Sequence, residues 1–141
     1  MITINVQLHG EHLMDTFPFW PGSVVSVRIG PVRHVGIAIS SQRVISCSLQ
    51  QRRVVEETLE EFSGGHPVTI EGYPGTLPPF EVIARARAKL GTPWDLFSFN
   101  CEHFVNWAHG RKADSPQLRS AVTLAMILGL VGVIFVGSRT A

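Results

Sequence analysis

Apolar and polar residues alternate through much of the first half of the chain, a pattern typical of β-strands with one buried face. Segments with this pattern, or with dense β-branched residues, are 2–8, 23–29, 34–40, 43–48 and 67–73, and 52–56 extends the series. Ser41-Gln42 separates two of them, so 34–40 and 43–48 are expected to form a hairpin. We therefore predict an antiparallel β-meander, in which the terminal run 2–8 is equally compatible with an unstructured end.

The spacing of apolar residues changes to that of a helix after Pro78-Pro79. One predicted helix carries Val82, Ile83, Ala86 and Leu90 and stops at Gly91, and a second runs from Cys101 to His109 before Gly110. A helical turn over 58–62 precedes Gly64-Gly65, and a further helix starts at Ser115-Pro116. Strands come first and helices after, which predicts an α+β fold with an antiparallel β-meander packed on two or three helices.

The C-terminal segment 121–137 is apolar and contains no charged residue. As a helix it would be about 25 Å long, close to the roughly 30 Å of a bilayer's hydrocarbon core. Arg111, Lys112 and Arg119 precede the segment and only Arg139 follows it, which predicts a cytoplasmic location for the preceding domain. We therefore expect an apolar C-terminal helix that anchors the protein in a membrane. The alternative is a buried core helix, against which the lack of a polar face argues.

Charge and cysteine content narrow the functional classes. Lys and Arg total 12 against 11 acidic residues, so no global field favours nucleic acid as a partner. Two cysteines cannot form the several disulfides of small secreted domains, which favours a reducing, cytosol-facing location. The N-terminus lacks the basic stretch and the continuous apolar run of a secretion signal. A chain of 141 residues suits one domain followed by a tail.

Cys101 is the candidate nucleophile, because the N–H groups and dipole of a helix start lower the pKa of a thiol. His34, at the start of a predicted core strand, is the candidate base that would take the thiol proton and later return it to the leaving group. We expect the helix to pack against the face of the sheet that carries His34, which would bring Cys101 within reach.

The other histidines and the second cysteine suit structural roles better. His103 points about 200° around the helix from Cys101, and His109 lies near the helix end, where capping is the expected role. With Cys101 they do not match a recurring zinc pattern, so no metal is expected. Cys47 has the surroundings of a small buried hydrophobic residue.

Two motifs resemble the lecithin retinol acyltransferase-like family, which includes the H-Ras-like suppressor phospholipases and acyltransferases. They are Arg33-His34-Val35-Gly36-Ile37-Ala38-Ile39 and Asn100-Cys101-Glu102-His103-Phe104-Val105-Asn106-Trp107. Similarity extends to Trp20-Pro21-Gly22-Ser23, Gly91-Thr92-Pro93-Trp94-Asp95 and Ser115-Pro116-Gln117-Leu118-Arg119, so it covers roughly residues 20–137. It implies an N-terminal extension at 1–19, a catalytic domain at 20–114 and a hydrophobic membrane-anchor helix at 115–141.

The resemblance implies a circularly permuted papain-like domain in which Cys101 forms an acyl thioester and His34 is the base, without a cofactor. The family's second histidine falls twelve residues after the first, and this chain has Ser46 there. A hydroxyl accepts a hydrogen bond from an imidazole but brings no charge, so Ser46 is a weaker orienting third residue. Ser48 and Gln50 are alternatives for that role.

The preferred function is a thiol-dependent phospholipid acyltransferase or phospholipase A-type hydrolase whose partners are a phospholipid membrane and an acyl-chain substrate. A membrane anchor would concentrate such an enzyme near its substrate. One alternative is a cysteine peptidase of the permuted papain-like type, which would use the same two residues. Another is a catalytically weak membrane-interaction module, which Ser46 favours because it departs from the family pattern.

Overall fold

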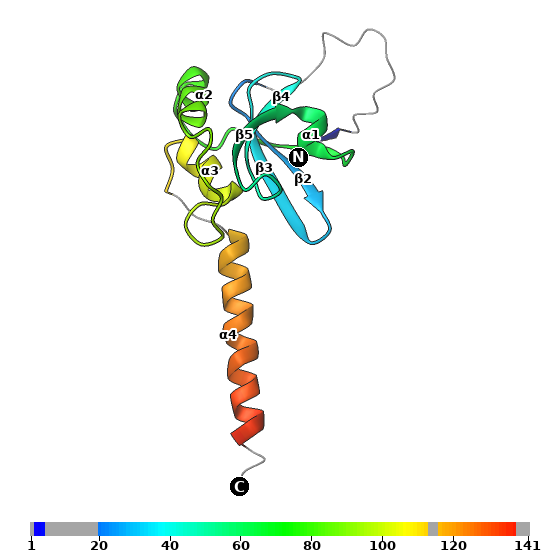
Figure 1. The fold of residues 1–141 in the computed structure, drawn as a ribbon, viewed down its shortest axis with the longest axis vertical. Coiled ribbons are helices and arrows are strands. Elements are labelled where there is room, and N and C mark those ends of the chain that lie inside the picture. The colour runs from blue at the N-terminus through cyan, green and yellow to red at the C-terminus, as the bar shows by residue number, and fades with distance from the viewer. Residues whose placement is uncertain (1, 5–19, 113–115, 138–141) are drawn as a thin grey trace.

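A computed structural model of the chain describes residues 2–4, 20–112 and 116–137. Six strands form one antiparallel sheet with the order β1-β6-β2-β3-β4-β5. Figure 1 shows the neighbouring strands β2 to β5 of this sheet and the helices beside them. Their bounds are β1 Ile2–Ile4, β2 Val24–Ile29, β3 Val32–Ala38, β4 Arg43–Ser48, β5 Arg53–Thr58 and β6 Val68–Gly72. The predicted meander is confirmed for β2 to β5, which includes the hairpin of β3 and β4, whereas β6 crosses over and pairs with β2. The short terminal strand also forms over residues 2–4, where it pairs with β6, while residues 5–8 of that prediction lie outside the described part.

Four helices accompany the sheet: α1 Leu59–Ser63, α2 Pro79–Ala88, α3 Cys101–Ala108 and α4 Pro116–Gly137. The start of α1 is fixed by a capping box between Thr58 and Glu61, and its end by Gly64 in the left-handed conformation. Pro79 occupies the first turn of α2, where a missing N–H removes no helical hydrogen bond. The helices predicted from apolar spacing are therefore confirmed, and the fold is α+β.

The two faces of the sheet bury different clusters. Side chains of β3 and β4 with odd residue numbers pack against α2 and α3. This cluster includes Val35, Ile37, Ile45, Cys47, Val82, Ala86, Phe104, Val105 and Ala108. The opposite face packs against α1 through Val25, Val27, Ala38, Val44, Leu59, Phe62 and Val68. Helices thus cover both faces, and a residue's parity in β3 decides which helix it meets. Strand order alone does not establish a permuted papain-like topology, which stays a prediction.

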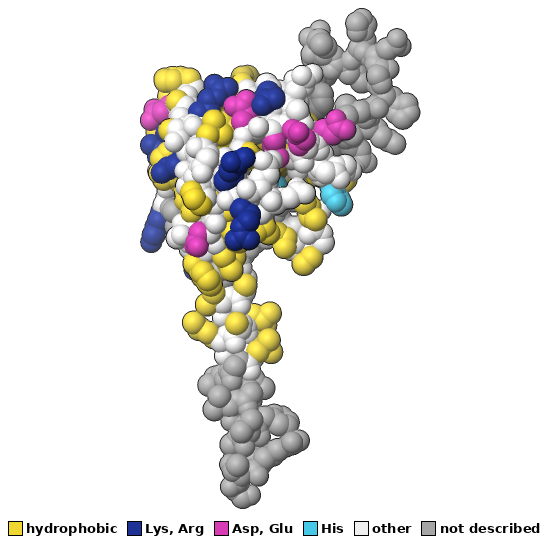
Figure 2. All heavy atoms as spheres, in the orientation of Figure 1, with side chains coloured by type: hydrophobic (Ala, Val, Ile, Leu, Met, Phe, Trp, Pro, Cys, Tyr) yellow, Lys and Arg dark blue, Asp and Glu magenta, His cyan; other side chains and the backbone are white. Residues whose placement is uncertain are grey.

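The C-terminal helix α4 extends away from the sheet and its covering helices (Figure 1). Its start at Pro116 agrees with the predicted helix, whereas the predicted cap, Ser115, lies outside the described residues. In the part of α4 whose side chains are described, Leu124, Met126, Ile127 and Leu128 are exposed (Figure 2), so the alternative of a buried core helix is wrong there. Among the described residues, no helix has both the length and the apolar character needed to cross a membrane, so the predicted transmembrane anchor is not found there.

Candidate functional site

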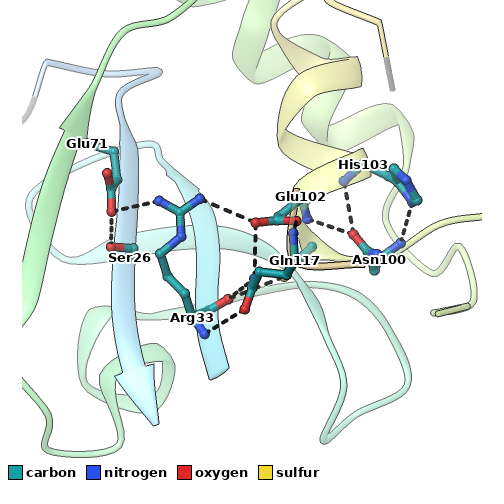
Figure 3. Close-up of polar contacts among 8 residues, drawn as sticks. Ser26, Arg33, Glu71, Asn100, Glu102, His103 and Gln117 are labelled. Atoms are coloured by element: carbon teal, nitrogen blue, oxygen red, sulfur yellow. Dashed lines mark hydrogen bonds and ion pairs between the residues drawn. The ribbon is translucent and has the colours of Figure 1, made fainter. Parts of the chain in front are cut away.

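Cys101 is the first residue of α3, and the local sequence fixes this start. The side chain of Asn100 accepts hydrogen bonds from the backbone N–H groups of Glu102, at 3.0 Å, and His103, at 3.1 Å. The His103 ring returns a bond by accepting from the Asn100 N–H (Figure 3). This reciprocal arrangement is a capping box, which holds Cys101 in the first turn. His103 therefore has a structural role, in agreement with its expected exclusion as the base.

The next feature is an unpaired stretch of β3. This strand pairs with β2 along its length but with β4 only over residues 36–38. Backbone groups of successive strand residues point to opposite sides. The backbone of Ala38 bonds toward β2 and that of Ile39 toward β4. Arg33 and Val35 have the same parity as Ile39, so their backbone groups point to the β4 side, where β4 does not pair with them. We call residues 33–35 the open edge of β3.

The Cys101 sulfur lies at this open edge, with its Sγ 4.0 Å from the carbonyl oxygen of Arg33. Burial raises the pKa of the Cys101 thiol and is the largest influence on it, while a hydrogen bond from the Val35 backbone and others from the start of α3 act in the opposite direction. The net direction is upward. The expected low pKa at a helix start is therefore wrong, because removal from water disfavours the thiolate more strongly than the N–H groups favour it.

His34 lies on the face of the sheet that α1 covers. It pairs with Val27 across β2, and its ring centroid is 4.9 Å from that of Phe62. Burial lowers the pKa of His34 to about 4, so the imidazole is neutral at physiological pH. The expectation that α3 would pack on the same face as His34 is wrong, because α3 packs on the opposite face.

A cavity of about 720 Å³ lies at the open edge of β3, and His34 and Cys101 both line it. Most of the other lining side chains are apolar, and they come from strands, loops and α4: Ile29, Val32, Cys47, Leu49, Phe62, Trp94, Leu96 and Ala121. Within the described residues, no hydrogen bond joins the imidazole of His34 to the thiol of Cys101. The site is therefore an apolar cavity with a neutral thiol and a neutral imidazole in its wall.

Ser46 shares the sheet face of His34, since it pairs with Gly36 two residues further along β3. It is fully buried, and its hydroxyl donates a hydrogen bond of 2.6 Å to the Glu57 carboxylate. Burial raises the pKa of Glu57, whose side chain also lines the cavity. Sequence analysis did not identify this carboxylate, because Glu57 belongs to the neighbouring strand β5 and reaches Ser46 only across the sheet. Ser48 and Gln50, the alternatives to Ser46, line the cavity as well.

Polar residues that were not among the predicted site residues surround the open edge. Arg33 forms ion pairs with Glu71, at 3.1 Å, and with Glu102, at 3.4 Å. Gln117, in the first turn of α4, bonds to both Arg33 and Glu102 (Figure 3). Glu102 is 4% exposed although it is acidic, a combination that requires such partners. Its position directly after the cysteine was the available signal for a role in the site.

The remaining candidates have the structural roles that their positions indicated. Cys47 is completely buried, and its thiol donates to the carbonyl of Phe99. His109 is the C-cap of α3, and its Nε2 lies 3.0 Å from the carbonyl oxygen of Gly22. Among the described residues, no three His, Cys, Asp or Glu side chains gather in a way that could hold a metal ion.

Comparison with known proteins agrees with the motifs around His34 and Cys101. Residues 19–113 match the family described as lecithin retinol acyltransferase. Similar curated proteins are lecithin retinol acyltransferase from Mus musculus, 30% identical over 122 residues, and from Rattus norvegicus, 31% identical over 122 residues. Each comparison covers 70% of this chain and 52% of the relative, so the chain spans about half the length of these relatives. The family match includes the whole capped start of α3 and the open edge of β3, and the chain belongs to the lecithin retinol acyltransferase family.

Proposed function

We propose that the protein is a thiol-dependent acyltransferase, with phospholipase A-type hydrolysis as the outcome when water accepts the acyl group. The observation that carries this proposal is the position of Cys101, whose sulfur lies at the open edge of β3 in the wall of an apolar cavity that His34 also lines. Membership of the lecithin retinol acyltransferase family supports the reaction class.

In the proposed first step, the Cys101 sulfur attacks the carbonyl carbon of a lipid ester while His34 accepts the thiol proton. The tetrahedral intermediate collapses by breaking the bond to the alcohol oxygen, and His34 returns the proton to that oxygen. A Cys101 thioester and a free alcohol result. In the second step, water or another acceptor attacks the carbonyl carbon of the thioester while His34 takes its proton. The carbon–sulfur bond then breaks, His34 returns the proton to the sulfur, and the acyl group leaves as a fatty acid or on the acceptor.

Both groups are uncharged before the reaction, which sets the form of this mechanism. The thiol pKa is raised and the imidazole pKa is lowered to about 4, each chiefly by burial. A resting thiolate–imidazolium pair is therefore unfavourable, so proton transfer has to accompany attack. Val35 assists by directing its N–H to the sulfur as negative charge develops there.

His34 has to turn toward the open edge for this transfer. Its ring contacts Phe62, and within the described residues no hydrogen bond restrains it. Because β4 does not pair with residues 33–35, no neighbouring strand blocks a change of rotamer that brings the ring closer to the sulfur. Ser46 supports the turned ring as a hydrogen-bond acceptor, since its own proton is engaged by Glu57.

The lining of the cavity favours an acyl chain as the substrate portion. Its volume is within the usual range for ligand sites, about 300–1,000 Å³. Apolar side chains dominate its wall, which suits a hydrocarbon better than a peptide backbone that requires hydrogen-bond partners. We therefore propose a phospholipid membrane as the partner and source of the acyl group, with the catalytic domain on its cytoplasmic side. The peptidase alternative is disfavoured on the same ground.

A catalytically weak protein is the second candidate. It is favoured by the raised thiol pKa and by the location of α3 on the sheet face opposite His34. The two candidates differ in the expected effect of the cysteine. An enzyme loses its function in Cys101→Ala, whereas a binding module keeps its membrane-related function in that variant.

The test uses the full chain with vesicles of phosphatidylcholine carrying a labelled acyl group and, in parallel, with a mixture of fluorogenic peptides. We expect label to be released or transferred from the lipid and no peptide to be cleaved. Cys101→Ala should abolish the lipid reaction, and Thr123→Val, a change at an exposed position of α4 outside the cavity lining, should retain it. Peptide cleavage without lipid turnover, or lipid turnover that persists in Cys101→Ala, would contradict the proposal.

A further inference from the structure

Gln117 on α4 makes an unusual two-point contact with the backbone of β3. Its side-chain oxygen accepts a hydrogen bond of 3.0 Å from the Arg33 N–H, and its side-chain nitrogen donates one of 2.8 Å to the Arg33 carbonyl (Figure 3). A neighbouring strand would bond to one residue in the same way. The amide of Gln117 therefore takes the place of the missing strand at the open edge.

The same residue is tied to the helix that carries the nucleophile. Glu102, next to Cys101, accepts hydrogen bonds from the backbone N–H of Gln117, at 3.2 Å, and from its side-chain nitrogen, at 3.1 Å. The carboxylate thus satisfies an N–H of the first turn of α4, where no helical acceptor exists. Glu102 also pairs with the Arg33 guanidinium. Gln117 is consequently bonded to the residues that flank both His34 and Cys101 in sequence.

We propose that Gln117 is a positioning residue for the acyl-transfer reaction, which holds residues 33–35 and the start of α3 at a fixed separation. This inference rests on the proposed function and deepens it. Arg33 provides the carbonyl nearest the sulfur, and Val35 provides the N–H that faces it. Fixing Arg33 therefore fixes the hydrogen bond that Val35 makes to the developing thiolate. The first turn of α4 is part of the active-site wall, in addition to any role of the helix elsewhere.

A merely structural glutamine would affect stability alone, so the test needs a readout specific to the sulfur. The pH profile of Cys101 alkylation provides it, because alkylation requires the thiolate. The measurement uses iodoacetamide on the full chain in a Cys47→Ala background, with folding monitored by circular dichroism. Variants are Gln117→Ala, which removes the two-point contact, and Gln117→Glu, which keeps the size but removes the donor to Arg33. The matched control is Thr123→Val, which removes an exposed side-chain bond two turns further along α4.

We expect the alkylation profile to move to higher pH in Gln117→Ala and further in Gln117→Glu, where a second carboxylate lies beside Glu102. With labelled lipid, kcat should fall between about tenfold and a hundredfold in both variants while KM changes less, because alignment rather than binding is lost. Thr123→Val should match the parent protein in both measurements.

An unchanged alkylation profile in Gln117→Ala and Gln117→Glu would overturn the inference, even if activity fell, because a general loss of structure would then be the cause. Equal shifts in Thr123→Val would overturn it as well. If the parent protein fails to turn over lipid, the proposed reaction is wrong, yet the alkylation profiles still decide whether Gln117 positions the sulfur. The two failures are therefore distinguishable.

Discussion

The two halves of β3 differ in their surroundings although one strand contains both. Residues 36–38 pair with β2 and with β4, whereas residues 33–35 pair with β2 alone and meet Cys101 and Gln117 on the other side. Residues 36–38, the doubly paired half, stabilise the fold through strand pairing. Residues 33–35, the open half, leave backbone donors and acceptors available to side chains from α3 and α4. The candidate site therefore lies where pairing between two neighbouring strands stops, although β4 itself continues to Ser48.

The largest expected effect concerns the open half. Replacing His34 with Asn should lower kcat/KM for the labelled lipid between about a hundredfold and a thousandfold, because the general base is lost. Thr123→Val, a change at an exposed position of α4 outside the cavity lining, is the control and should have little effect. Steady-state kinetics on vesicles checks both. A loss smaller than about threefold in the His34 variant would remove this residue from the mechanism.

A pH-dependent stability effect separates His34 from other residues of β3. Its pKa is about 4 when folded and 6.5 when free, so the unfolded chain binds the proton more readily below pH 6.5. The stability of the folded state is therefore complete above pH 6.5 and decreases as pH falls toward 4, by about 3 kcal/mol in total from this residue. Urea unfolding at several pH values should show this slope, and His34→Phe should flatten it. An equal slope in the variant would contradict the buried, neutral imidazole.

The doubly paired half should be sensitive to volume rather than to charge. A Cβ added to Gly36 would lie 2.5 Å from Val44 Cγ1 and 3.1 Å from the Phe62 ring. Gly36→Ala should therefore lower the free energy of unfolding by about 1–3 kcal/mol. Val32→Ala, on a side chain that is 51% exposed, should change it by about 0.5 kcal/mol or less. Similar effects of the two substitutions would remove the proposed contrast in packing.

The smallest expected effect on the acyl-transfer rate concerns Ser46, which pairs with Gly36 where the two halves of β3 meet. Ser46 occupies the position of the family's second histidine and bonds to Glu57. Replacing it with His should raise the acyl-transfer rate a few-fold, because an imidazole beside a carboxylate orients a second imidazole better than a hydroxyl does. Thioester formation with labelled lipid provides the measurement. An unchanged rate would show that this position does not orient His34.

The local sequence pattern was sufficient to predict the helices and strands and the position of Cys101 at a helix start. Alternation predicted the hairpin of β3 and β4, and the apolar spacing before Gly110 predicted that a helix begins at Cys101. These features depend on residues close in sequence, where capping and periodicity act directly. The burial of Cys47 followed from the same alternation.

The arrangement around the sulfur depended on contacts that no local pattern contains. The end of β4 pairing at Gly36 follows from the divergence of two strands rather than from their composition. Gln117 and Arg33 are 84 residues apart, and nothing in either segment indicates that they pair. The direction of the Cys101 pKa was mispredicted because burial is a property of the whole fold, whereas the helix start is local.

Intact-protein mass spectrometry after exposure to phospholipid vesicles tests the central claim most directly, since it detects the intermediate itself. The account predicts that the full chain gains the mass of one fatty acyl group, that hydroxylamine removes it, and that Cys101→Ser does not acquire it. An adduct that persists in Cys101→Ser, or a chain that turns over lipid without any hydroxylamine-sensitive gain in mass, would contradict the thioester at Cys101.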